Sequence, residues 1–217
     1  MTLAENWVAG IEFNELPAPN RLMKAMERKY AERLRDCGEI MLRTIEYFRK
    51  WENEVLGDPN EGHGLFIHDA HQMQIGSHKE DFVFAWCTSL PSITPERIRL
   101  IAKEVGYDCM LTIRDPMTLF QRMRQSLLST HPKYLMQCGY VIYERGVAVE
   151  KDILLSKTRK FQSNIFQKDK EKYADDFEYR IAVTNGTFTS SGCSELLLTV
   201  GDCTDIAFIE ELPTGDI

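Results

Sequence analysis

Eight short runs rich in β-branched and aromatic residues recur between turn-forming segments, and this pattern constrains the fold more than any other feature of the sequence. Helical segments lie among these runs without the regular strand–helix–strand alternation of a doubly wound fold. The sequence therefore predicts an α+β protein with a mixed, largely antiparallel or split β-sheet flanked by helices. The expected strands cover residues 39–48, 65–67, 82–87, 108–113, 138–143, 177–184, 196–200 and 206–209.

Helical signals occur in four places. Apolar residues recur at helical spacing in residues 20–37, so we expect an N-terminal helical segment there, packed on the sheet. A capping residue followed by proline predicts two more helix starts, at Thr94 and at Asp115. Another helix is expected within residues 164–174. Residues 1–217 are expected to form a single domain, since one core can organise a chain of this length.

Charge and hydropathy narrow the possible partners and location. The net charge of −7 makes extensive nucleic-acid binding an unfavourable reading, because nucleic-acid binders usually present an excess of basic residues. No apolar run approaches the length of a membrane span, and the first residues lack the pattern of a signal peptide. The six cysteines are widely spaced and suit reduced thiols. We therefore expect a cytoplasmic protein without membrane contact; the sequence does not define its oligomeric state.

Most familiar catalytic motifs are missing. The sequence contains no phosphate-binding P-loop, no glycine-rich dinucleotide-binding turn and no nucleophile elbow. Four histidines, His63, His68, His71 and His78, lie near one another in the chain. No second group of Cys, Asp or Glu has zinc-ligand spacing, so no metal site is predicted.

Polar residues within or at the end of expected strands are the main functional signal. Arg43, the pair Thr88 and Ser89, and the acids Asp176 and Glu178 interrupt stretches that otherwise read as buried. Such groups cost several kcal/mol in a core unless they are paired or used. Because Asp176 and Glu178 are two residues apart on an expected strand, we expect both carboxylates on the same side of the sheet.

These residues belong to a pattern that resembles a family of uncharacterised bacterial and phage proteins over roughly residues 39–210. That family has no settled activity to carry over. The features that carry the resemblance are, in chain order, the strand bearing Arg43, the aromatic pair Tyr47-Phe48, the Gly-Asp-Pro-Asn-Glu-Gly loop at residues 57–62, the strand that ends in Cys87-Thr88-Ser89, and the sequence Asp176-Phe177-Glu178-Tyr179-Arg180.

More distantly, the same order resembles the ADP-ribosyltransferases, which carry Arg, then Ser or Thr, then Glu on three separate strands. The resemblance implies that Arg43 holds the pyrophosphate side of NAD and that Thr88 and Ser89 organise the site. It also implies that Glu178 contacts the nicotinamide ribose and that Asp176 occupies the position of a second acid. The middle element departs from a clean Ser-Thr-Ser, and Asp176 is one carbon shorter than the usual glutamate, which puts transfer to protein arginine in doubt.

The chemistry fits those roles. Cleaving the nicotinamide glycosidic bond builds positive charge on the ribose, so a carboxylate such as Glu178 would stabilise the transition state. Tyr47 would contribute a flat wall for a ring of NAD. The function predicted from the sequence is an NAD-dependent ADP-ribosyltransferase-like protein, a toxin or a factor in bacteria–phage conflict, which uses NAD as substrate and modifies an unknown macromolecular acceptor.

Other interpretations stay open. Arg43 could lie on an exposed strand face or pair with Glu178, and the acids could form a solvated face balanced by Arg180. Residues 50–64 read as an exposed acidic loop, which favours an alternative function as a non-enzymatic inhibitor or adaptor that binds a protein partner through its acidic surface. A nuclease is a weaker reading, because its metal ions would need a second cluster of carboxylates.

Overall fold

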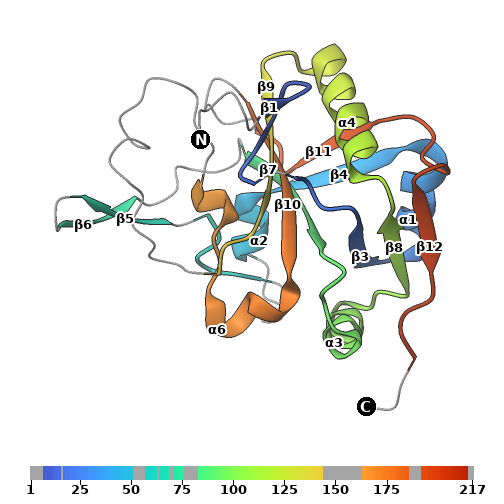
Figure 1. Ribbon diagram of the computed structural model, residues 1–217, viewed down its shortest axis with the longest axis horizontal. Helices are drawn as coiled ribbons and strands as arrows, with labels where there is room; N and C mark the ends of the chain where they lie inside the picture. The colour runs from blue at the N-terminus through green and yellow to red at the C-terminus, as the bar shows by residue number, and fades with distance from the viewer. Residues whose placement is uncertain are drawn as a thin grey trace.

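The computed structural model describes residues 7–15, 17–50, 57–62, 64–68, 71–75, 83–143, 163–185 and 192–214. Within these ranges a ten-stranded sheet is flanked by helices, and a separate two-stranded sheet projects away from it (Figure 1). The strands are β1 (Trp7–Val8), β2 (Ile11–Phe13), β3 (Leu22–Met26), β4 (Glu39–Thr44), β5 (Gly64–His68), β6 (His71–Ile75), β7 (Val83–Ser89), β8 (Cys109–Ile113), β9 (Tyr134–Tyr140), β10 (Glu178–Asn185), β11 (Glu195–Thr199) and β12 (Ala207–Glu210). The helices are α1 (Arg28–Cys37), α2 (Ile45–Lys50), α3 (Pro95–Val105), α4 (Pro116–Thr130) and α6 (Lys170–Tyr173), with the 3₁₀ helices η2 (Ser163–Phe166) and η3 (Ala174–Asp176).

The centre of the large sheet is β10, which pairs antiparallel with β9 on one side and with β7 on the other. The outer strands follow in the order β1-β2-β9 on one flank and β3-β8-β12 on the other. Among the described ladders of this sheet, β2 with β9 is the one parallel pair. The prediction of a mixed, largely antiparallel sheet flanked by helices is therefore confirmed.

The sheet divides at β7. The edge of β7 that faces away from β10 pairs with β4 at Phe84 and Ala85 and with β3 only at Ser89. Strand β3 continues onto β8, whereas β4 continues onto β11, so the two branches lead to different parts of the molecule. Among the described strands, none pairs with the middle of this edge, at Trp86 to Thr88. At these positions the edge of β7 is bordered by side chains and not by another strand, which leaves room for a cleft.

Local capping explains why α3 and α4 begin where the sequence predicts. The Thr94 side chain accepts a hydrogen bond from the backbone N–H of Arg97 at 3.2 Å, and Asp115 accepts one from Thr118 at 3.0 Å. Each cap satisfies a backbone donor that the first helical turn leaves free, and the proline that follows needs no such partner. Both predicted helix starts are confirmed.

The predicted helix over residues 20–37 is wrong in its first half. Residues Leu22–Met26 form strand β3, which pairs with β8 from Leu22↔Ile113 to Met26↔Cys109. Only Arg28–Cys37 is helical, and that helix, α1, ends at Gly38 in a left-handed conformation. The hydrogen bonds to β8, some 85 residues further along the chain, outweigh the helical spacing of this short apolar segment. Intrinsic secondary-structure propensity is a weak preference that such tertiary contacts override.

Three other boundaries differ from the prediction. Residues 39–48 split into β4 and α2, whose start is capped by Thr44 Oγ1 accepting from the Tyr47 N–H at 3.2 Å. Strand β9 begins at Tyr134 and ends at Tyr140, earlier than the predicted run over residues 138–143. The helix expected within residues 164–174 consists of two short pieces, η2 and α6.

Alternation along the central strands creates two different faces. Tyr179, Ile181 and Val183 of β10 join the main core beneath α1 and α4, whereas Ala182 packs on the opposite face with residues of α2 and η2. Glu178 and Arg180 have the same parity as Ala182 and therefore lie on that second face. No helix within the described ranges is long and apolar enough to cross a membrane.

Candidate functional site

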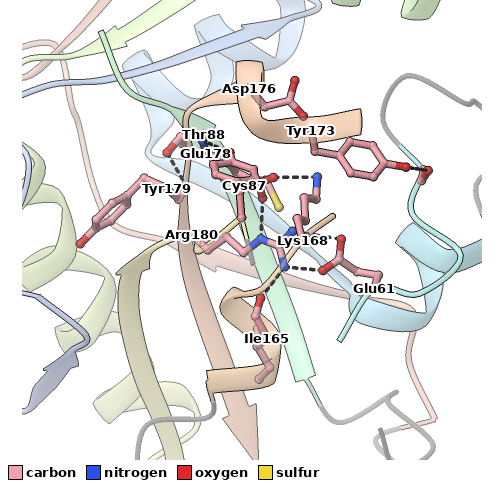
Figure 2. Close-up of polar contacts among 12 residues, drawn as sticks. Glu61, Cys87, Thr88, Ile165, Lys168, Tyr173, Asp176, Glu178, Tyr179 and Arg180 are labelled. Carbon is pink, nitrogen blue, oxygen red and sulfur yellow. Dashed lines mark hydrogen bonds and ion pairs between the residues drawn. The ribbon is translucent and has the colours of Figure 1, made fainter. Parts of the chain in front are cut away.

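A buried ionic cluster lies on the second face of β10, centred on Arg180 (Figure 2). The Arg180 Nε donates to Glu178 Oε1 at 2.5 Å, and the two terminal nitrogens donate to the two carboxylate oxygens of Glu61, one of them at 3.0 Å. The same guanidinium donates to the carbonyl oxygen of Ile165. Arg180 is 1 % exposed, so all of these bonds are made away from water. The fork geometry of the guanidinium allows one residue to hold three elements together.

Lys168 completes the cluster from the other side of Glu178. Its ammonium group donates to Glu178 Oε2 at 2.7 Å, and both side chains are buried. Burial alone would raise the pKa of Glu178, but the positive charges of Arg180 and Lys168 outweigh burial and lower that pKa. Burial likewise favours neutral Lys168, yet Glu178 and Glu61 raise its pKa overall. Glu178, Lys168 and Arg180 are therefore charged at neutral pH.

The turn at residues 57–62 is drawn into this cluster. Asp58 accepts from the Asn60 N–H at 2.9 Å, the Glu61 N–H donates to the Asp58 carbonyl at 2.8 Å, and Tyr173 of α6 donates its hydroxyl to the Gly57 carbonyl at 2.7 Å. Asp58 and Glu61 are each only 2 % exposed. The prediction that residues 50–64 form an exposed acidic loop is thus wrong for these two acids; residues 51–56 and 63 lie outside the described part.

Asp176 does not share a strand face with Glu178 as predicted. It belongs to η3, and Phe177 between the two acids has φ = 44°, the left-handed region that interrupts strand alternation. Asp176 instead forms a partly buried ion pair with Arg97 Nε of α3 at 2.7 Å. Burial raises the pKa of Asp176, partly offset by Lys168 and Arg97. The reading of both acids as a solvated strand face is also wrong, because both are at most 5 % exposed.

A cavity of about 100 Å³ opens beside the cluster. Its wall includes Ser89, Asp176, Glu178 and the consecutive residues of β3 around Lys24. Three consecutive residues of β7, at positions 87–89, also line this cavity. Consecutive strand residues point to opposite faces, so a cavity that touches all three meets β7 along its edge, where the sheet divides.

A second cavity, of about 340 Å³, occupies the gap between β3 and β4. Arg43 and Tyr47 line it, with the Arg43 guanidinium 4.8 Å from the centre of the Tyr47 ring. Arg43 is also ion-paired with Glu195 on the neighbouring strand β11. The predicted partner of Arg43 in a structural ion pair, Glu178, is therefore not the partner that the structure records.

The two cavities adjoin, because Lys24, Phe48, Cys87 and Tyr107 line both. Along β7, Arg43 is opposite Ala85 and Glu178 is opposite Ser89. The two positions on β7 are four residue steps apart, which corresponds to about 13 Å along the strand at about 3.3 Å per residue. The structure thus brings the predicted site residues Thr88, Ser89, Asp176 and Glu178 to the first cavity and Arg43 and Tyr47 to the second.

The hydroxyls and the thiol of β7 differ in their availability. Thr88 is buried and donates its hydroxyl to the Tyr179 carbonyl at 2.8 Å, so it ties β7 to β10. Ser89 is partly exposed in the cavity. Burial raises the pKa of Cys87 to about 12, which keeps this thiol protonated and unreactive at neutral pH. Ser89 is thus the more accessible of the two predicted hydroxyls.

Three important residues of this region were missed in the sequence. Glu61 falls in the expected acidic loop, Lys24 in the segment predicted to be helical over residues 20–37, and Lys168 in the helix expected within residues 164–174. For Glu61 the available signal was the resemblance, because the loop at residues 57–62 belongs to the pattern that carries it. Within the described ranges, no group of three or more His, Cys, Asp or Glu side chains is arranged to hold a metal ion.

The ionic cluster predicts a specific loss of stability in acid. A carboxylate whose pKa is lowered by folding stabilises the protein fully above its unfolded-state pKa, about 4.3 for glutamate, and loses that contribution as the pH falls further. Glu178→Gln lacks this titration. At neutral pH we expect the wild type to have a larger free energy of unfolding than Glu178→Gln. Below about pH 4.3 this difference in free energy should shrink by up to about 1.4 kcal/mol per pH unit.

Urea unfolding from pH 7 to pH 2.5 measures this gap for the two proteins. Asp176, whose pKa is raised, acts in the opposite direction but is present in both proteins, so the comparison cancels its direct contribution. Parallel curves for the wild type and the variant across this range would show that Glu178 carries no depressed pKa.

No family model, no curated protein and no solved structure matches this chain in the comparisons made. The described residues form a divided, largely antiparallel sheet with a cleft beside a buried ionic cluster.

Proposed function

We propose that this protein binds NAD in the cleft formed by the two adjoining cavities and acts as an ADP-ribosyltransferase-like enzyme. The observation that carries the proposal is the pairing of Ser89 with Glu178 in register across β7 and β10, at the wall of a cavity that adjoins one lined by Arg43 and Tyr47. An elongated cleft with two chemically different ends suits a dinucleotide.

In the proposed reaction, the bond between the nicotinamide nitrogen and ribose C1′ breaks and its electron pair leaves with nicotinamide. A nucleophilic oxygen or nitrogen of the acceptor then bonds to C1′, and its proton passes to Asp176 or to water. Positive charge develops on the ribose as the bond breaks, so an ionised carboxylate beside it lowers the barrier.

Glu178 is suited to orient the ribose. Arg180 and Lys168 keep it ionised, although their charges offset part of its field. Each carboxylate oxygen accepts one recorded hydrogen bond, and a carboxylate offers about four lone-pair positions. An oxygen facing the cavity therefore retains capacity for a ribose hydroxyl, which would make hydrogen bonding the main contribution of Glu178.

The alternative of an adaptor with an acidic binding surface has less support. The net charge of −7 is compatible with it, but two of the four acids in the expected acidic loop, Asp58 and Glu61, are buried, and the other two lie outside the described residues. The biological setting that we propose from the resemblance is a toxin or a factor in bacteria–phage conflict that acts in the cytoplasm.

The test is to incubate the protein with labelled NAD, with and without a bacterial cell extract that supplies acceptors. We expect release of nicotinamide together with free or protein-bound ADP-ribose, and a rise in melting temperature with millimolar NAD. Glu178→Gln is expected to lower turnover about 10²-fold or more, the scale of losing one transition-state contact. Ser89→Ala, which leaves the ionic cluster intact, should lower it as well.

Melting curves of both variants without NAD control for misfolding. Absence of both nicotinamide release and thermal stabilisation in the wild type would contradict the proposal. Equal turnover in the wild type and both variants would show that the reaction does not use this site.

A further inference from the structure

Lys24 lies at the junction of the two cavities. It belongs to β3, next to the single point where β3 pairs with β7, and it lines both cavities. Its ammonium group donates to the Cys87 carbonyl at 2.6 Å and lies 5.8 Å from the centre of the Trp86 ring. The side chain therefore points to the edge of β7 that has no neighbouring strand among the described residues.

Charge distinguishes Lys24 from the other three residues that line both cavities. Phe48 is apolar, and burial raises the pKa values of Cys87 and Tyr107 to about 12, so both are neutral at physiological pH. Lys24 is thus the basic residue at the junction of the two cavities. A ligand that spans both cavities has to pass this ammonium group.

The other cations of the cleft already have carboxylate partners. Arg180 and Lys168 are paired with Glu178. Arg43 is paired with Glu195, and Arg33, which lines the second cavity, is paired with Glu39. Lys24 has no ion pair within the described residues, and its recorded hydrogen bond uses one of three ammonium protons. Two donors are left for a ligand.

We propose that Lys24 binds the phosphate or pyrophosphate group of the ligand at the junction of the two cavities. This inference rests on the proposed function, because it names the anion-binding residue of the same cleft. It also transfers the phosphate-binding role, which the resemblance gave to Arg43, to a residue on a different strand. Arg43, which contacts Glu195 and the Tyr47 ring, then forms part of the wall of the second cavity.

Replacing Lys24 with an apolar residue should affect thermal stability and ligand affinity differently. Burial lowers the pKa of Lys24, with Cys87 and Glu178 acting against this, so the charged form is costly in the unliganded protein. Replacement of a poorly compensated buried charge by an apolar side chain of similar length often leaves stability unchanged or raises it. Lys24→Met is therefore expected to melt at the wild-type temperature or above it while losing affinity for phosphate ligands.

The experiment measures calorimetric binding of ADP, inorganic pyrophosphate and adenosine to the wild type, Lys24→Met and a control variant. Lys133→Met is the matched control, because Lys133 is exposed and lines neither cavity. We expect Lys24→Met to weaken ADP and pyrophosphate binding roughly ten- to hundredfold, the scale of a charge-assisted hydrogen bond. Adenosine, which has no phosphate, should bind both proteins equally, and Lys133→Met should behave as the wild type.

The possible results separate this inference from the proposed function. Wild-type affinity for ADP in Lys24→Met would overturn the inference, and NAD turnover in that variant would leave the proposed function standing. Loss of ADP binding in Lys24→Met together with no NAD turnover in the wild type would keep the inference and overturn the reaction. No binding of ADP, pyrophosphate or NAD to the wild type at millimolar concentration would overturn both. Lys24→Gln replaces the methionine variant if the latter does not fold.

Discussion

Arg180→Met is expected to lower the free energy of unfolding by about 3–5 kcal/mol, because it leaves buried carboxylates without their main partner. Arg180 is 1 % exposed and forms ion pairs with Glu61 and Glu178 while also donating to the Ile165 carbonyl. Methionine fills much of the same space but donates no hydrogen bond. Lys168 would still neutralise Glu178, whereas Glu61 would lose the bidentate contact that holds the turn at residues 57–62.

Equilibrium urea unfolding at pH 7 measures this effect. Arg33→Met is the matched control, since Arg33 is exposed and its ion pair with Glu39 lies at the surface, where such pairs contribute about 0–1 kcal/mol. A loss in Arg180→Met no larger than in Arg33→Met would show that the cluster is not a tightly packed ionic unit. If Arg180→Met does not fold, Arg180→Lys, which keeps the charge but not the fork, should show an intermediate loss.

Gly38→Ala is expected to destabilise the protein by about 2–5 kcal/mol, combining left-handed strain with overpacking. Gly38 ends α1 at φ = 67°, and its N–H satisfies carbonyls of the last helical turn. A Cβ at this position would overlap the carbonyl oxygen of Gly201 and lie 2.6 Å from the Gly201 nitrogen. Both obstructing atoms belong to the backbone, so a side-chain rotation cannot relieve the clash.

Gly106→Ala isolates the conformational part of that effect. Gly106 ends α3 in the same left-handed conformation, at φ = 79°, but an added Cβ would meet nothing within 4 Å. We expect Gly106→Ala to cost only the left-handed strain, about 1–2 kcal/mol. Urea unfolding of both variants gives the difference directly. Equal losses would mean that the backbone around Gly201 moves aside freely.

The parts of the fold that the sequence predicts correctly are those with local causes. Thr94 and Asp115 begin their helices by bonding to N–H groups three residues away, so the sequence contains both partners side by side. The predicted end of the helical segment at residue 37 is likewise correct, since the left-handed cap that follows it favours glycine, here Gly38. The strand β7 was recognised from its own composition, within two residues at its end.

The parts that were predicted wrongly depend on distant partners. Residues Leu22–Met26 were predicted to be helical but pair with β8. Asp176 was predicted to lie on a strand, but the left-handed conformation of Phe177 separates it from β10. The assignment of Arg43 and Glu178 to one site stays a prediction. The two residues line adjoining cavities, and each has a different charged partner.

The sequence by itself determined the class of fold, the two best-capped helices and the polar residues that a buried strand does not ordinarily carry. Tertiary structure decided what those residues contact: Arg180 meets Glu61 across 119 residues of chain, and Lys24 reaches the Cys87 carbonyl across 63. Caps and turns are encoded within a few residues, because their hydrogen bonds close over one turn. Ionic partners in a sheet depend on strand order and register, which local sequence does not specify.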